Sequence, residues 1–561
     1  MKSIFRPLVL LGAGLLALNS GFTPPAGAAP AGHEWPAADP AAVARWQSLR
    51  FGMFIHWGPV SLTGHEIGWS RGAQTPIEVY DNLYHQFNPT NFNADEWVAI
   101  AKAAGMKYIV LTTKHHDGFC LWDTKLSDYN IMHTPFHRDV VKELAAACKK
   151  QGIDFGAYYS VTDWYNTNWP VTSPAGKVKR ETSDLDAYEK YLQGQITELI
   201  QNYGPLITIW NDVPAMYGKR GAATIEMVRR LQPDILIDDR TGDGGDYQTP
   251  EQRIGKFQLD HPWESCMTIS AHNAWAWGGA KDGVKSLAAC LDMLIRGTGG
   301  DGNILLNVGP RPDGLIDPEQ VNRLKEIGDW LAHNGESIYG TRGGPWKPAG
   351  SISSTRKGNN VYIHLISADQ SRIELPALPA EIKSATLLNG GKVEFNQQAG
   401  KLVITLPAGP RDAIDTIIKL VLDRPALDLP VLTPAPEIKA SASNVFEKQK
   451  AEYGAEKAFD NDANTRWATD SGTKQAWIAA DLGHPQAIGN IHLQEAKDYA
   501  GRVTKFEFQY REGGDWKTIF SGTNIGANFK KTFPPITARE FRLNILDATE
   551  GPTFSEIELT R

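Results

Sequence analysis

The stretch Tyr108-Ile109-Val110-Leu111-Thr112-Thr113-Lys114-His115-His116-Asp117-Gly118 decides the fold of the largest part of this chain. It is an apolar run that passes directly into polar and charged side chains and ends at a glycine. A segment with helical periodicity, 94–104, precedes it, and another, 139–151, follows it. A buried strand between two helices is typical of a parallel sheet covered by helices.

The same alternation of strand and helix continues from Ala41 to about Tyr339. Besides Tyr108–Lys114, the predicted strands are Phe51–Trp57, Phe155–Ser160, Leu206–Trp210, Ile235–Asp238, Cys266–Ile269 and Ile304–Val308. The other predicted helices are 185–203, 223–231, 284–296 and 317–334. This pattern predicts an α/β (TIM-like) barrel over 36–344 whose eighth strand is irregular or missing. A doubly wound open sheet is the alternative, although no G-x-G-x-x-G follows the first strand.

Polar side chains stand at the ends of five successive apolar runs. These side chains are His56, the run 114–117, Tyr158, Asp212 and Arg240. Because the carboxyl ends of barrel strands meet at one mouth, we expect these residues to gather there. The spaced H-x-H of barrel metallohydrolases is absent, so we expect no catalytic metal.

Carboxylates at such a mouth suit glycoside hydrolysis, which needs one ionised and one protonated carboxyl group. Asp212, near Arg240, is the candidate for the ionised group. Glu264 follows Trp263, and an apolar neighbour raises the pKa of a carboxylic acid, so Glu264 is our first choice for the proton donor. Glu251 is the alternative.

The N-terminus has the three parts of a secretory signal. Lys2 and Arg6 precede an apolar run from Leu8 to Ala17, and Ala26-Gly27-Ala28 follows it. We therefore predict a signal peptide at 1–28 and a secreted or periplasmic protein. The apolar run is shorter than the roughly 20 residues that cross a bilayer, so no membrane span is predicted.

Composition and cysteine spacing argue against a nucleic-acid-binding protein and against a zinc protein. The formal net charge is −7, with 57 basic and 64 acidic residues, so no global positive field exists to hold nucleic acid. The four cysteines form no C-x-x-C pair, which argues against zinc. Whether these cysteines pair with one another stays open.

Two further units are predicted after the barrel. Residues 345–424 contain short alternating strands broken by Gly, Pro and Asn, and predict a small antiparallel β-sandwich. Residues 425–436 contain four prolines and predict a stiff linker. Residues 437–561 predict a second β-sandwich or jelly roll.

The first unit resembles the α-L-fucosidases of glycoside hydrolase family 29. The motifs that carry the resemblance are Phe51-Gly52-Met53-Phe54-Ile55-His56-Trp57-Gly58, Glu66-Ile67-Gly68-Trp69-Ser70-Arg71-Gly72, Lys114-His115-His116-Asp117-Gly118-Phe119, Trp210-Asn211-Asp212, Trp263-Glu264-Ser265-Cys266-Met267-Thr268 and Leu305-Leu306-Asn307-Val308-Gly309-Pro310. The resemblance implies a retaining exo-hydrolase that removes terminal α-L-fucose through a covalent fucosyl-enzyme. It also implies a barrel followed by a small β-sandwich.

Carried over residue by residue, the resemblance places the nucleophile at Asp212. It places substrate-binding residues at His56, Glu66, Trp69, His115, His116, Tyr158 and Arg240. The position of the acid/base varies between family members, so Glu264 stays the first choice and Glu251 the alternative. Val213 follows Asp212 where many members have glycine, which affects the local backbone.

The C-terminal unit resembles the discoidin, or F5/8 type C, fold, which includes carbohydrate-binding module family 32. The matching stretches are 458–467, Trp477-Ile478-Ala479-Ala480-Asp481-Leu482-Gly483 and Ser555-Glu556-Ile557-Glu558-Leu559. By this resemblance, Asp460, Asp462, Thr465 and Glu556 hold a structural calcium ion. The alternative for the first three is an ordinary Asx-rich turn.

The expected partners are fucosylated oligosaccharides or glycoconjugates, and catalysis needs no cofactor. Two alternatives remain: a retaining glycosidase for a related sugar such as an α-L-galactoside, and a non-catalytic fucose-binding protein. Linkage preference, the ligand of the C-terminal domain and oligomeric state do not follow from the sequence.

Overall fold

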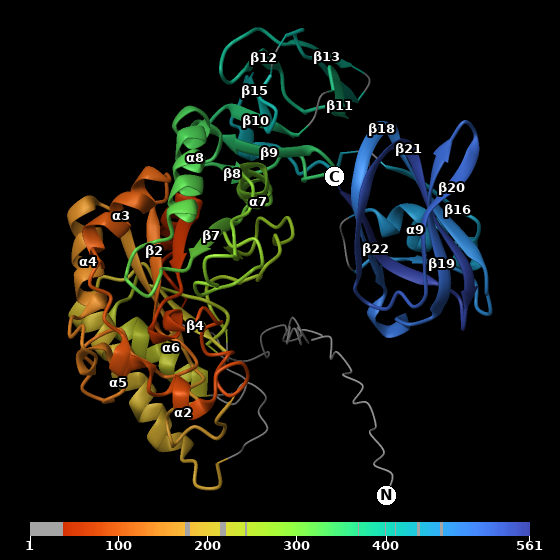
Figure 1. Ribbon diagram of the computed structural model, residues 1–561. Helices are drawn as coiled ribbons and strands as arrows, with labels where there is room; N and C mark the ends of the chain where they lie inside the picture. The colour runs from red at the N-terminus through yellow and green to blue at the C-terminus, as the bar shows by residue number, and fades with distance from the viewer. Residues whose placement is uncertain are drawn as a thin grey trace, which may run out of the picture.

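The computed structural model describes residues 37–173, 180–213, 220–241, 244–367, 370–398, 400–409, 411–434, 438–460 and 464–560. The predicted signal peptide, 1–28, lies outside them. Three sheet-containing units follow one another along the chain (Figure 1).

The first unit is a curled parallel sheet with the strand order β5-β4-β3-β2-β1-β7-β6. Its strands are β1 (Phe51–Ile55), β2 (Tyr108–Lys114), β3 (Asp154–Ser160), β4 (Thr208–Asp212), β5 (Leu236–Ile237), β6 (Glu264–Thr268) and β7 (Asn303–Val308). Each strand from β1 to β5 pairs with its neighbour in sequence, and β1 also pairs with β7. This is the order of a barrel, so the open doubly wound alternative is excluded.

An irregular segment takes the place of the eighth strand. Isolated parallel bridges join Asp238 to Tyr247, Gln248 to Trp263 and Glu251 to Cys266. The segment 247–251 therefore connects the β5 edge of the sheet to the β6 edge. The prediction had no strand between these edges, because 247–251 lacks the apolar run of its neighbours.

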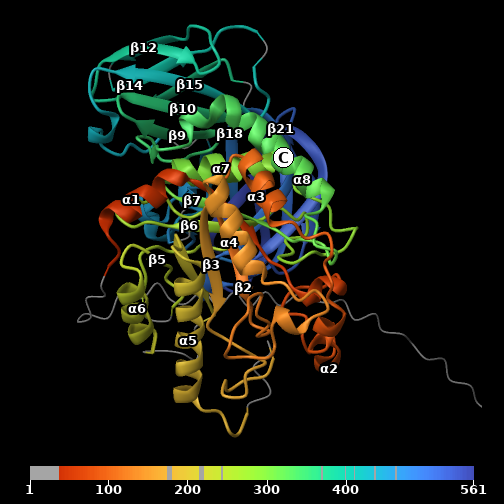
Figure 2. The same cartoon turned by 90° about the vertical axis from the view of Figure 1, so that its left-hand side faces the viewer.

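Helices α3 to α6 lie along the outside of this sheet (Figure 2). The α-helices of this unit are α1 (Pro40–Leu49), α2 (Ile77–Tyr80), α3 (Ala94–Ala103), α4 (Val140–Gln151), α5 (Leu185–Tyr203), α6 (Arg220–Leu231), α7 (Leu287–Gly299) and α8 (Pro318–Asn334). The six predicted helices agree with α3 to α8 within three residues at each end, whereas α1 and α2 were not predicted. Aspartate, asparagine or serine side chains cap the N-termini of α3, α4, α5, α7 and α8.

Large side chains fill the barrel interior. Phe54, Tyr108, Tyr158, Trp210 and Leu305 belong to one buried cluster there. Gly52 makes room for this packing, since a Cβ at that position would lie 2.5 Å from the Tyr108 ring. The interior is therefore a packed core, and any pocket must lie above it, at the carboxyl ends of the strands.

The second unit consists of two antiparallel sheets beside α7 and α8 (Figure 1). Its strands are β8 (Arg342–Gly343), β9 (Ile352–Lys357), β10 (Asn360–Ile366), β11 (Arg372–Pro376), β12 (Ile382–Leu387), β13 (Glu394–Gln398), β14 (Lys401–Thr405) and β15 (Asp415–Leu422). Tyr362, Ile366 and Ile417 of this unit join the core cluster of the first unit. The two units are thus packed together through apolar side chains.

Much of the predicted linker belongs to this second unit. Ala426 and Leu429 are buried in its core, and the Arg356 side chain donates hydrogen bonds to the carbonyl oxygens of both. Leu432 N donates to Pro345 O. Between residues 425 and 432 the chain therefore lies on the sandwich and does not act as a free spacer, because its apolar side chains find a core.

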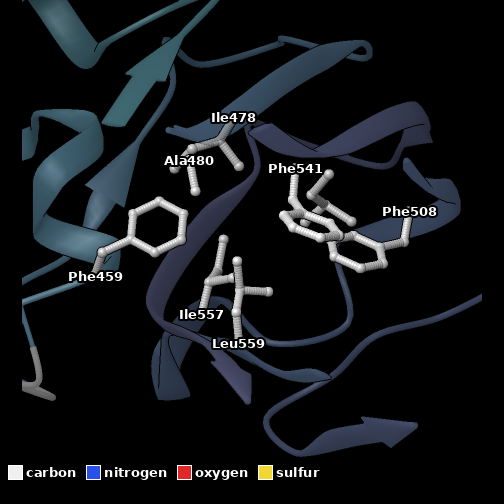
Figure 3. A pocket seen from close by; sticks show the side chains of 8 residues that line it. Phe459, Ile478, Ala480, Phe508, Phe541, Ile557 and Leu559 are labelled. Carbon is white, nitrogen blue, oxygen red and sulfur yellow. The ribbon is translucent and has the colours of Figure 1, made fainter. Parts of the chain in front are cut away.

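The third unit is one large antiparallel sheet system with short helices at its start. Its strands are β16 (Lys439–Ala442), β17 (Trp467–Ala468), β18 (Ala476–Glu495), β19 (Val503–Glu512), β20 (Asp515–Gly522), β21 (Phe529–Ala548) and β22 (Thr553–Thr560), and its α-helix is α9 (Lys450–Tyr453). A small hollow in this unit is lined by apolar side chains, among them Phe459, Ile478, Phe508 and Phe541 (Figure 3). Such a lining has no polar group to orient a sugar, so we assign no ligand to this hollow.

Two sequence questions are answered by the structure. All four cysteines, Cys120, Cys148, Cys266 and Cys290, are buried and unpaired. No helix within the described residues is long and apolar enough to cross a membrane.

Candidate active site

Asp212 is the last residue of β4 and lies at the mouth of the barrel. Its carboxylate accepts hydrogen bonds from Tyr158 Oη at 2.8 Å and from Arg240 Nη1 at 2.8 Å. Burial, the largest single influence, would raise its pKa, but the charge of Arg240, the nearby His116 and the hydrogen bonds from Arg240 and Tyr158 together hold the pKa of Asp212 below its ordinary value. The carboxylate is therefore ionised and oriented, as a nucleophile requires.

Arg240 joins Asp212 to a second carboxylate, that of Glu251. The same nitrogen, Arg240 Nη1, lies 2.8 Å from Asp212 Oδ1 and 3.0 Å from Glu251 Oε2. The two carboxylate oxygens are therefore less than about 6 Å apart, a limit that includes the separation of about 5–5.5 Å in retaining glycosidases. The Glu251 side chain is 44% exposed, so it can reach a substrate.

The geometry argues against Glu264, our first choice for the acid/base. Glu264 is the first residue of β6, at the opposite end of the strand from the mouth, and it is fully buried. It accepts hydrogen bonds from Tyr108 Oη and Trp210 Nε1 inside the barrel core. Burial raises the pKa of Glu264 to about 7, as its neighbours suggested, but the core separates it from the pocket.

Hydrogen bonds determine the tautomers of His56 and His116. His56 Nδ1 lies 2.6 Å from Asn307 Oδ1, an acceptor, so Nδ1 carries the proton. His116 Nδ1 lies 2.6 Å from Ser160 Oγ, whose own proton goes to Thr162 O at 2.5 Å. Both rings therefore have an unprotonated Nε2.

Both histidines are also neutral. Burial lowers the pKa of His56 to about 3 and that of His116 to about 4. His116 Nε2 lies 3.7 Å from Asp212 Oδ2, and two acceptors at this distance do not bond to each other. A sugar hydroxyl between them could donate to either one.

His115 and Tyr158 complete this wall of the pocket. The His115 ring stacks on Tyr158 with centroids 5.6 Å apart and an interplanar angle of 8°. His115 Nδ1 is buried and has no hydrogen-bond partner among the described residues. Gly68 belongs to the loop after β1 and lets that loop approach the His115 ring closely, since a Cβ at Gly68 would lie 2.6 Å from His115 Nδ1.

Trp69 and Glu66 come from the loop after β1 and differ in what they contact. Trp69 is 44% exposed and meets the ring of His116 edge-on, with centroids 5.4 Å apart. Glu66 instead accepts backbone hydrogen bonds from Ile67, Trp275 and Ala276. Its carboxylate therefore joins two loops at the mouth.

Sequence reasoning missed two residues that position the site. Asn307 Nδ2 donates to Trp275 O at 2.7 Å, so this one amide orients both His56 and the Trp275 loop. Trp275 lies against the His56 ring, with centroids 4.9 Å apart. Asn307 lies near the end of β7, and the rule that flagged the other strand ends would have found it.

Val213, directly after Asp212, has a φ of 48°. This left-handed conformation is costly for a β-branched residue and is the reason why glycine suits the position. Val213 N donates to Asp212 Oδ1 at 2.9 Å, and Val213 O accepts from Thr162 Oγ1 at 2.8 Å. The strained residue thus braces the Asp212 carboxylate.

Three of the four predicted calcium ligands lie within the described residues, and Asp462 lies outside them. Thr465 Oγ1 is 2.8 Å and 2.9 Å from the two Asp460 oxygens and 3.2 Å from Lys457 O. Glu556 is buried on β22. These hard oxygen donors are of the kind calcium prefers, although no group of three or more His, Cys, Asp or Glu in metal-binding proximity occurs within the described residues.

A barrel with paired carboxylates, neutral histidines and aromatic rings at its mouth has the groups that glycoside hydrolysis requires. Residues 26–336 match the family model Alpha-L-fucosidase, and residues 437–559 match the F5/8 type C domain model. The chain belongs to the α-L-fucosidase family, glycoside hydrolase family 29, and has a C-terminal F5/8 type C domain.

Curated and solved relatives agree with this membership. Human tissue α-L-fucosidase is 30% identical over 425 residues, covering 68% of this chain and 89% of its own. The structure of α-L-fucosidase isoenzyme 1 from Paenibacillus thiaminolyticus has a TM-score of 0.63 and 32% identity, covering 68% of this chain and 99% of its own. A family 29 α-L-fucosidase from Bacteroides thetaiotaomicron, trapped as a covalent intermediate, has a TM-score of 0.63 and 26% identity, covering 70% of this chain and 98% of its own.

Proposed function

We propose that this protein is a retaining exo-α-L-fucosidase in which Asp212 is the nucleophile and Glu251 is the acid/base. The observation that carries the proposal is the bridge formed by Arg240 Nη1, which holds both carboxylates within about 6 Å of each other at the barrel mouth. The covalent intermediate of the Bacteroides thetaiotaomicron relative supports double displacement.

In the first step, Asp212 attacks the anomeric carbon and the bond from that carbon to the glycosidic oxygen breaks. Glu251 gives its proton to the departing oxygen, so the aglycone leaves as an alcohol and fucose is esterified to Asp212. In the second step, Glu251 takes a proton from water, which attacks the anomeric carbon and releases Asp212. The two inversions together retain the configuration.

The neutral histidines serve as hydroxyl acceptors. His56 and His116 each keep the lone pair of Nε2 available, because the proton of each ring is held at Nδ1. A site built to accept sugar hydroxyls rejects analogues that lack them, since its buried acceptors would then stay unpaired. These residues thus select the sugar, whereas Asp212 and Glu251 react with it.

We further propose that the substrates are terminal fucosides of oligosaccharides or glycoconjugates and that the protein is secreted or periplasmic, with 1–28 as signal peptide. The proposed structural calcium ion would be held by Asp460, Asp462, Thr465 and Glu556. Chelation should then lower the unfolding temperature of the C-terminal domain and leave hydrolysis of small fucosides unchanged.

The test is hydrolysis of 4-nitrophenyl α-L-fucoside by wild type, Glu251→Ala and Glu264→Ala, with and without azide. An activated leaving group needs little acid assistance, and azide replaces the water that a missing base would activate. We expect azide to rescue Glu251→Ala and to give β-fucosyl azide. Rescue of Glu264→Ala alone would reverse the assignment, and no turnover by wild type would count against the function itself.

A further inference from the structure

Tyr165 is a large aromatic residue that stays 41% exposed and directly follows Trp164, whose ring contacts the pocket residues His116 and Trp69. It lies in the loop after β3, one residue beyond Trp164. The Trp164 ring contacts His116 and Trp69 edge-on, with centroids 5.2 Å and 5.5 Å away. The loop therefore turns one aromatic ring to the pocket wall and places the next one beyond it.

The Tyr165 ring is supported on one face and open on the other. It stacks on Tyr129, with centroids 4.0 Å apart and an interplanar angle of 15°. Tyr129 is itself buried and is held edge-on by Phe119 and Tyr84. Because Tyr129 covers one face, the exposed area belongs to the other face and to the edge of the ring.

The backbone under Tyr165 is held in place as well. Asp163 Oδ1 accepts hydrogen bonds from the backbone N–H of Tyr165 and of Asn166, at 3.0 Å and 2.9 Å. Asp163 in turn forms a buried ion pair with Lys114, the last residue of β2. A ring fixed in this way loses little conformational entropy when a ligand binds to it.

We propose that the open face of Tyr165 is an outer subsite for a sugar ring of the aglycone, so that the preferred substrate extends at least two sugar units beyond the cleaved bond. The inference rests on the proposed fucosidase function. Tyrosine combines a flat apolar face, which suits the C–H face of a pyranose, with a polar edge that can meet its hydroxyl groups. His116, Trp164 and Tyr165 then form a path outward from Asp212.

The experiment compares wild type, Tyr165→Ala and Tyr165→Phe on fucosides of one linkage whose aglycone has one, two or three sugars. The linkage is the one that wild type cleaves fastest as a disaccharide. We expect wild type to gain in kcat/KM when the second or third sugar is added, through a lower KM. In Tyr165→Ala the gain in kcat/KM should be about 3- to 10-fold smaller than in wild type, with kcat unchanged. Tyr165→Phe should keep most of the gain.

Two controls separate the possible failures. Phe395 is a similarly exposed aromatic residue, 37%, on β13 of the second unit, and Phe395→Ala should leave every KM unchanged. On 4-nitrophenyl α-L-fucoside all variants should match wild type, because this substrate has no outer sugar. If wild type gains nothing from longer aglycones, or Tyr165→Ala gains as much as wild type, the subsite is overturned. If no variant hydrolyses any fucoside, the proposed function fails instead.

Discussion

The indole nitrogen of Trp210 donates a hydrogen bond of 3.2 Å to Glu264 Oε1, and Trp210 lies two residues before Asp212 on β4. Side chains two residues apart on a strand point to the same face, so Trp210 lies beneath Asp212 inside the barrel. Glu264 is therefore a buried residue below the pocket, although it is a carboxylic acid in a family motif.

Glu264→Gln should retain activity and change the pH dependence of stability. The folded pKa of Glu264, about 7, is above the ordinary value of about 4.3 in an unfolded chain. Its contribution to the free energy of unfolding is thus fully present below about pH 4 and is lost as the pH rises to 7. Urea unfolding at pH 5 and pH 8 should show wild type losing more stability than the variant, by a few kcal/mol at most. Equal losses would show that Glu264 is not protonated in the fold.

Asp212→Ala should lower kcat on 4-nitrophenyl α-L-fucoside by about 10⁴-fold or more, because the proposed fucosyl ester forms on its carboxylate. The fold should persist, since Asp212 lies at the mouth and its side chain is 13% exposed. Glu264→Gln serves as the matched control for activity, and circular dichroism checks the fold. A variant with wild-type turnover would remove Asp212 from the mechanism.

Val213→Gly should leave the stability unchanged or raise it by up to about 1 kcal/mol. The φ of 48° costs a valine about 1–2 kcal/mol, whereas glycine adopts it freely. The control is Val110→Gly in the buried centre of β2, which should cost several kcal/mol through lost packing. Thermal unfolding measures the change in stability of both variants relative to wild type. Similar losses at the two positions would mean that Val213 is not strained.

Arg50→Met should lower the free energy of unfolding by about 3–5 kcal/mol. Arg50 is fully buried, pairs with Asp301 at 2.7 Å and donates to the carbonyl oxygen of Thr341, so its removal leaves buried acceptors unsatisfied. Arg45→Met breaks an exposed pair with Asp154 and should cost less than about 1 kcal/mol. Denaturant unfolding of the two variants measures both losses in the free energy of unfolding. Equal losses would contradict the stabilising role that we assign to Arg50.

The barrel and most of the residues at its mouth could be predicted from the amino-acid sequence. Apolar runs that alternate with amphipathic helices leave few arrangements for a parallel sheet, and the ends of parallel strands meet at one edge. His56, His116, Tyr158, Asp212 and Arg240 could therefore be placed together before any coordinates were known. The same rule would have added Asn307.

Contacts between distant segments, which the sequence pattern does not show, bring Glu251 and not Glu264 to the arginine that binds Asp212. In the sequence, Glu264 stands two residues before the predicted strand Cys266–Ile269 whereas Glu251 stands in a polar stretch, and the starting residue of a short strand is poorly defined by pattern alone. The structure places Glu264 at the start of β6, where a side chain facing inward meets the core. It places Glu251 at the end of the irregular segment 247–251, where Arg240 reaches it. A neighbour in sequence can shift a pKa, but access to the substrate depends on strand register and barrel closure, which contacts between distant segments determine.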